Sequence, residues 1–194
     1  NVQYLKCNCS SSKKIKAVKV LDPNLCKIAG AHAGDGSLGQ DLRIEIIKND
    51  KKTISELNEI CSLRIYKIKN RLRATVQTKD IRNFISYASN LIKKRNITLI
   101  LRNQINLTDS YFKAMVAYKR WMFEVFGLEV EIKKHNKKNA WRIDYNNKII
   151  SRYFTKFFGF PVNSKTYIVR EPEIIKNSNI KFRRYFLTGL MTFE

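Results

Sequence analysis

The alternation of apolar and polar positions predicts both strands and helices in this chain. A period close to two, or a short apolar run, predicts strands over 42–47, 97–102, 128–134 and 140–145. A period near 3.6 predicts helices over 109–126 and 147–158, each stopped by the glycine that follows it. Helix, strands, helix, hairpin and helix in this order predict an α+β fold with an antiparallel sheet.

A further helix is predicted directly after Asp22, and its composition is unusual. Asp22 suits the cap position and Pro23 the first helical position. Residues 24–34 read NLCKIAGAHAG, and the turn signal Asp35-Gly36 ends them. Because so many of these side chains are small, the backbone of a second helix could approach this one very closely.

Residues 42–95 begin with the first predicted strand and read mainly as helices from 53 onward, so we expect a mainly helical insertion here. Within 53–73 the apolar spacing suits two short helices joined by a tight turn. The second of these would carry Arg64, Lys67, Lys69 and Arg71. A helix-turn-helix that reads DNA and ordinary helical packing are both open for this segment.

Charge narrows the choice of partner. The 194 residues include 38 Lys and Arg against 16 Asp and Glu, which gives a net charge of +22. The basic residues are interleaved with apolar and aromatic ones, apart from a basic N-terminal arm or edge strand over 1–20, so the positive surface belongs to the folded body. We expect a nucleic acid as partner, duplex DNA or RNA, because no separate basic amphipathic helix is present for a membrane.

Other features of the sequence exclude several classes of protein. No apolar run is long enough to span a membrane, and the N-terminus lacks the apolar stretch of a signal peptide, so we expect an intracellular protein. Cys7 and Cys9 form a C-x-C that has no matching downstream pair, and reduced thiols are favoured over zinc. His32 lies inside the small-residue helix, where we expect it to be packed and not to act as a ligand.

Two short motifs and the segment before the second one carry a resemblance to a known family. IAGAHAGDGSL (28–38) resembles the first motif of the LAGLIDADG homing endonucleases, and RYFLTGLMTFE (184–194) resembles the second, cut off before its expected Gly. Residues 158–190 are similar to the family's G-x-P-x-x-x-K-x-x-x-x-R-x-P approach to the second motif. The resemblance implies an αββαββα repeat over 21–183, with 42–95 as an insertion, and the start of a second repeat at 184–194, whose remainder is absent from this sequence.

The resemblance also implies a catalytic site. In the family the two motif helices pack through small residues, which correspond here to Ala29, Gly30, Ala33 and Gly189. Each helix delivers one acid, Asp35 or Glu194, and the neighbouring carbonyl groups of Gly34 and Phe193 help to bind Mg²⁺ or Mn²⁺. Lys165 is the lysine expected to reach the site and to offset negative charge in the transition state.

The family places its sheet in the major groove of DNA, so the exposed face of the sheet is the expected binding surface. Alternation puts Trp141, Ile143 and Tyr145 on one face of their strand and leaves Arg142 and Asp144 on the other. The residues expected to contact nucleic acid are Arg102, Lys133, Lys134, Lys137, Lys138 and Arg142.

These features together predict a site-specific, metal-dependent endonuclease for double-stranded DNA. A single repeat covers about half of a DNA site, so a second polypeptide is expected to supply the other repeat. The main alternative is a non-catalytic RNA-binding relative, such as an intron maturase or a protein bound to ribosomal RNA. A third possibility is a transcription regulator that uses the helix-turn-helix at 53–73.

Overall fold

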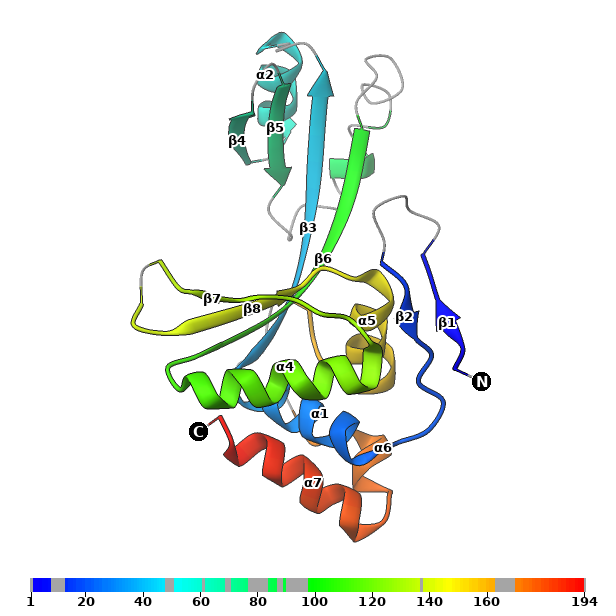
Figure 1. The fold of residues 1–194 in the computed structure, drawn as a ribbon. Coiled ribbons are helices and arrows are strands. Elements are labelled where there is room, and N and C mark those ends of the chain that lie inside the picture. The colour runs from blue at the N-terminus through cyan, green and yellow to red at the C-terminus, as the bar shows by residue number, and fades with distance from the viewer. Residues whose placement is uncertain are drawn as a thin grey trace. The chain divides into compact units, whose positions relative to one another are not determined.

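A computed structural model of the chain forms two compact units (Figure 1). Unit 1 consists of Asn1–Gly39 and Asn103–Glu194, and unit 2 consists of Gln40–Arg102. The structure describes residues 2–7, 13–47, 51–60, 62–68, 71–76, 84–86, 89, 98–136, 138–162 and 170–193.

Unit 1 contains the element order that the sequence predicts. Its elements are α1 (Pro23–Asp35), the start of β3 (Gly36–Ile47), the end of β6 (Thr98–Asp109), α4 (Phe112–Phe126), β7 (Ile132–Lys134), β8 (Trp141–Tyr145) and α5 (Lys148–Arg152). After α5 come a π-helix, η2 (Tyr153–Phe157), and the helices α6 (Glu173–Lys176) and α7 (Ile180–Met191). The predicted α+β class with an αββαββα order is confirmed, since β3 and β6 are the first strand pair and β7 and β8 the second.

Local chemistry explains where these helices begin and end. The Asp22 carboxylate accepts hydrogen bonds from the backbone N–H groups of Asn24 (2.8 Å) and Leu25 (3.0 Å), which caps α1. Asn147 caps α5 in the same way, and α4 ends at Gly127 in the left-handed region, at φ 66°. Helix α4 begins at Phe112, later than predicted, because β6 continues as far as Asp109.

The sheet of unit 1 has the order β3-β6-β8-β7, and its neighbouring strands β6, β8 and β7 are antiparallel. One face is apolar: Ile105 pairs with Tyr145 and Leu107 pairs with Ile143, and all four are buried. These side chains pack with α1 and α4 into one hydrophobic core, which also holds Trp121 and Phe126. The predicted alternation on β8 is therefore observed, and it leaves the second face of the sheet polar.

The N-terminal residues pack against the body of unit 1. β1 (Tyr4–Leu5) and β2 (Ile15–Lys16) form a two-stranded antiparallel sheet, and Ile15 is fully buried. The Asn147 amide donates to the Lys13 carbonyl (3.2 Å), and the Tyr153 hydroxyl bonds the N–H and the C=O of Val18 (3.2 and 3.0 Å). The basic segment 1–20, predicted as an arm or an edge strand, forms short strands at Tyr4–Leu5 and Ile15–Lys16 in a sheet of their own.

Unit 2 corrects the prediction of a mainly helical insertion over 42–95. Among the described residues of unit 2, α2 (Lys51–Ile60) and residues 84–86 are helical, but α2 is followed by the strands β4 (Leu63–Ile68) and β5 (Arg71–Val76). These strands pair antiparallel, and β5 also pairs with β3, in the order β4-β5-β3. A helix-turn-helix at 53–73 is therefore wrong. Alternation over LRIYKI, rich in β-branched and aromatic residues, outweighs the helical spacing of its apolar positions.

Candidate functional site

Helices α1 and α7 lie in direct backbone contact. A Cβ atom placed on Gly30 would lie 2.0 Å from the Phe186 carbonyl oxygen and 2.7 Å from the Leu190 nitrogen. A Cβ atom on Gly189 would lie 2.0 Å from the Lys27 carbonyl oxygen. Because these neighbours are backbone atoms, neither position has space for a side chain. Glycine at 30 and 189 therefore sets how closely the two helices approach.

The other two small residues of the expected interface are also packed. Ala29 is fully buried in the hydrophobic core, and Ala33 is partly buried against the same core. Lys27 lies beside this helix pair, and its ammonium group is 5.4 Å from the Trp121 ring centre and 5.3 Å from the Tyr185 ring centre. Residues of α1, α4 and α7 thus meet around one lysine, which ties the three helices together.

The C-terminal ends of α1 and α7 lie next to each other. A Cβ atom on Gly34 would contact Leu190 at 3.5 Å and the Phe193 Cβ atom at 3.8 Å. Asp35 is the last residue of α1 and is exposed, whereas Phe193 is buried and packs edge-on against the Tyr118 ring. Gly34, Asp35 and Phe193 are therefore grouped at one end of the helix pair.

This end suits a hard cation in its donor chemistry. The last carbonyl groups of a helix lack helical partners, and the C-terminus carries partial negative charge. Two such ends and the Asp35 carboxylate supply oxygen donors, which Mg²⁺ and Mn²⁺ prefer. Within the described ranges, no group of three or more His, Cys, Asp or Glu side chains could hold a metal ion. Glu194 and Lys165, the other expected catalytic residues, lie outside the described residues.

A second feature is a hydrogen-bonded network across the polar face of the sheet. The Arg142 Nε atom donates to the Asp144 carboxylate at 2.7 Å, and its Nη2 atom donates to the Asn106 side-chain oxygen at 3.0 Å. The Gln104 amide also donates to Asp144 at 3.0 Å, and the Asn106 amide lies 3.4 Å from the Ser37 hydroxyl. We call these five residues of β3, β6 and β8 the polar sheet network.

The polar sheet network is partly accessible to solvent. The side chains of Arg142 and Asp144 are 35% and 31% exposed. Each is held by neighbours on the same face, so their rotamers are restricted before any ligand binds. Restricted side chains lose less conformational entropy on binding, which suits them to recognise a defined pattern of donors and acceptors.

The strand register shows on which face of the sheet the residues expected to contact nucleic acid lie. Lys133 pairs with Arg142 and shares its face, whereas Lys134 pairs with Trp141 and lies on the opposite, helix-covered face. Lys138 is exposed in the connection between β7 and β8. Arg102 lies in β6, but its side chain is outside the described part of the structure, as is Lys137.

Sequence reasoning missed Gln104 and Asn106. The strand was expected to end at residue 102, but β6 continues to Asp109 and brings both amides beside Arg142 and Asp144. A signal was available, because Gln104, Ile105, Asn106, Leu107 and Thr108 alternate between polar and apolar residues.

Two buried tyrosines lie beneath the joined helix ends. The rings of Tyr118 and Tyr145 are 6.2 Å apart, and neither hydroxyl has a hydrogen-bond partner among the described residues. Burial raises the pKa of both phenols above the ordinary value, since the core disfavours the charged phenolate, and for Tyr118 the neighbouring Tyr145 adds to this effect. Both tyrosines therefore stay neutral at physiological pH.

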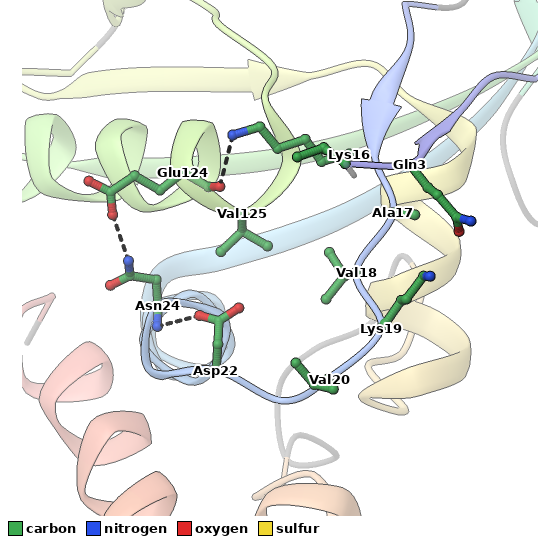
Figure 2. A pocket seen from close by; sticks show the side chains of 11 residues that line it. Gln3, Lys16, Ala17, Val18, Lys19, Val20, Asp22, Asn24, Glu124 and Val125 are labelled. Atoms are coloured by element: carbon green, nitrogen blue, oxygen red, sulfur yellow. Dashed lines mark hydrogen bonds between the residues drawn. The ribbon is translucent and has the colours of Figure 1, made fainter.

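A shallow groove beside the start of α1 is lined by residues of the N-terminal segment, α1 and α4 (Figure 2). Its volume is about 410 Å³. The Glu124 carboxylate accepts from the Asn24 amide at 2.6 Å, and the Lys16 ammonium group lies 3.4 Å from the Glu124 carbonyl oxygen (Figure 2). These polar groups bond each other, so we assign the groove a structural role.

The remaining chemically reactive side chains are packed. The His32 ring lies 4.6 Å from the Phe154 ring and 5.0 Å from the Phe160 ring, in agreement with a packed histidine. Cys26 is a buried free thiol, and burial raises its pKa to about 12, which makes it a poor nucleophile. Cys7 is partly buried.

No protein-family model and no curated protein matches this chain. Among solved structures, a C-terminal regulatory domain of aspartate kinase from Porphyromonas gingivalis is 11% identical, with coverage of 63% of this chain and 97% of its own and a TM-score of 0.28. Mesophilic variants of the homing endonuclease I-DmoI are 12% identical, with coverage of 69% and 93% and a TM-score of 0.24. Likenesses this low carry no conclusion about family or activity.

The described part of the chain contains no helix that is both long enough and apolar enough to cross a bilayer.

Proposed function

We propose that this chain is the DNA-binding and cleaving part of a LAGLIDADG-type homing endonuclease. The observation that carries the proposal is the contact between α1 and α7, in which Gly30 and Gly189 let the backbones touch and the two C-terminal ends lie together. The sequence segments that resemble the family's two motifs, 28–38 and 184–194, include these contact positions. The αββαββα order of unit 1 supports the same assignment.

The polar sheet network is the proposed surface for reading bases. A guanidinium group fixed by Asp144 and Asn106 presents its remaining N–H groups in a defined direction, which suits the acceptor atoms of a base edge in the major groove. Exposed Lys133 and Lys138 flank this face and suit contacts to phosphates, which position a protein on DNA without reading its sequence.

Metal ions would be held at the joined helix ends. Asp35 and the carbonyl groups of Gly34 and Phe193 would bind a divalent ion there, and Glu194 is the second carboxylate that the resemblance implies. Such an ion stabilises charge on the scissile phosphate and lowers the pKa of a bound water. Asp35 is exposed and lies at the end of α1, so it is accessible to a phosphodiester.

A second polypeptide that carries the other repeat is the proposed partner. Helix α7 supports this proposal by its exposed apolar side chains: Ile180 is 58% exposed, Leu187 51% and Met191 70%. They are seven and four residues apart, the spacing of one helix face. We propose that this face is covered by the part of the second repeat that follows its motif helix.

The proposal is tested first by metal binding. Mn²⁺ binding to the purified protein, followed by electron paramagnetic resonance, should be weakened at least tenfold by Asp35→Asn. Asp22→Asn is the matched control, because it makes the same change at the opposite end of α1 and asparagine keeps the cap. Equal Mn²⁺ affinity in both variants would contradict the proposed metal site.

Cleavage is tested on a plasmid library that carries randomised duplex targets. In the presence of the polypeptide that supplies the other repeat, we expect nicked or cut plasmids only with Mg²⁺ or Mn²⁺, from the parent and Asp22→Asn proteins but not from Asp35→Asn. Binding to structured RNA in preference to duplex DNA, with no metal-dependent nicking, would replace this proposal with the non-catalytic RNA-binding alternative.

A further inference from the structure

Two segments of the sequence contain no acidic residue. Residues 1–21 hold five lysines and no Asp or Glu, and residues 145–170 hold five Lys and Arg and no Asp or Glu. The chain has 16 acidic residues in all, and residues 60–79 and 81–108 are free of them as well. A stretch without acids leaves its cations without local neutralisation.

The structure places parts of these two segments side by side in unit 1. The Asn147 side chain bonds the Lys13 carbonyl, and the Tyr153 hydroxyl bonds both backbone groups of Val18. Residues 13–18 therefore run along the helical segment 148–157, and Figure 1 shows β2 beside α5. The two contacts involve Asn147 and Tyr153, and they hold Lys13 and Val18. The N-terminal stretch 13–18 is therefore fixed to the helical segment at both of its ends.

Three exposed cations form a row on the helical segment. Lys148, Arg152 and Lys156 follow one another at steps of four residues, and all are exposed. In an α-helix four residues overshoot a full turn by about 40°. In a wider π-helix, the form of 153–157, four residues fall short of a full turn. The two deviations have opposite signs, so the π-helix keeps Lys156 in line with the other two.

This row lacks the carboxylate partners that several other basic residues of unit 1 have. Within the described ranges no ion pair involves Lys14, Lys148, Arg152 or Lys156. By contrast, Lys119, Arg120 and Lys176 each lie within 4.0 Å of a glutamate carboxylate. Like charges four residues apart on a helix repel each other and destabilise it. The row therefore costs the fold stability, and a bound polyanion would offset that cost.

We propose that Lys14, Lys148, Arg152 and Lys156, which we call the acid-free surface, bind the phosphate backbone of a nucleic acid. The acid-free surface is separate from the polar sheet network, since its residues lie in the N-terminal segment and α5–η2 and not in β3, β6 or β8. It gives the protein a second, sequence-independent contact with its nucleic acid, in addition to the sheet. Exposed lysine and arginine at a helical repeat of about 6 Å suit successive phosphates along a strand.

The test is the salt dependence of binding to a short fluorescent duplex of arbitrary sequence, measured by anisotropy between about 50 and 200 mM salt. The variant combines Lys148→Gln, Arg152→Gln and Lys156→Gln, which remove the charges at exposed positions and keep a similar helix propensity. Each phosphate contact contributes a slope of about −0.9 in log Kobs against log salt, so the slope should become shallower by about 2 to 3. Thermal unfolding verifies that the variant is folded.

The matched control combines Lys119→Gln, Arg120→Gln and Lys176→Gln, which lower the net charge equally at cations that already have carboxylate partners. It should change the slope by less than about 1. A charge-retaining variant, with Lys148→Arg and Lys156→Arg, should keep the parent slope.

Equal slopes for the acid-free variant and its control would overturn the proposal. A second result would also overturn it: the acid-free variant loses binding to anionic phospholipid vesicles but keeps the parent salt slope on duplex DNA. That result would assign the surface to a membrane. The readout is binding and not cleavage, so a protein that never cuts DNA would refute the proposed nuclease activity and leave this result unaffected.

Discussion

Gly30→Ala is the substitution that most directly tests the contact between α1 and α7. The added Cβ atom would lie 2.0 Å from the Phe186 carbonyl oxygen, whereas ordinary van der Waals contact begins at 3.4 Å. The shortfall of 1.4 Å, which is 3.4 minus 2.0, has to be met by moving one helix, because the obstacle is backbone and not a flexible side chain.

The expected magnitude combines two opposing effects. Overpacking a well-packed interior costs about 1 to 3 kcal/mol, and a rigid backbone obstacle puts this case at the upper end. Alanine is a better helix former than glycine by about 1 kcal/mol, which offsets part of the cost. We expect a net loss of about 2 kcal/mol in the free energy of unfolding, which lowers Tm by about 4 to 8 °C in a chain of this size.

Gly34→Ala is the matched control, one turn further along the same helix. Its Cβ atom would find the Leu190 side chain at 3.5 Å and the Phe193 Cβ atom at 3.8 Å, which are ordinary contacts. It should leave stability unchanged or raise it by up to about 1 kcal/mol. Urea and thermal unfolding followed by circular dichroism measure both variants. If Gly30→Ala is as stable as Gly34→Ala, the close approach of the helices is refuted.

Two further predictions concern the sheet and the core. Arg142→Gln should relax base preference by about 1 to 3 kcal/mol at one position, whereas Lys134→Gln on the opposite face should not relax it; equal preference profiles would count against the polar sheet network as a reader. Tyr118 and Tyr145 keep their protons in the folded state, so their contribution to stability should be constant below pH of about 10 and fall above it as the unfolded phenols ionise. Tyr118→Phe should reduce that fall without loss of stability at neutral pH, because its hydroxyl has no partner among the described residues; an unchanged urea midpoint profile would contradict this.

The sequence alone determined the elements that depend on local chemistry. Asp22 and Pro23 start α1, Gly127 ends α4, and alternation along β8 separates its core face from its polar face, all as predicted. These features are readable because capping, left-handed glycine and strand alternation act over a few neighbouring residues. The small side chains of α1 also indicated a close helix contact.

Only the tertiary structure decided which of two local preferences was followed, and which distant residues meet. The segment 63–76 has helical spacing and strand-forming residues together, and pairing of β5 with β3 selects the strands. The polar sheet network joins β3, β6 and β8, whose side chains meet through strand order. The acid-free surface likewise depends on two long-range contacts, Asn147 with Lys13 and Tyr153 with Val18. The partners in these contacts are separated by 134 and 135 positions in the sequence. Such meetings follow from packing and strand pairing over long distances in the chain, which local patterns do not encode.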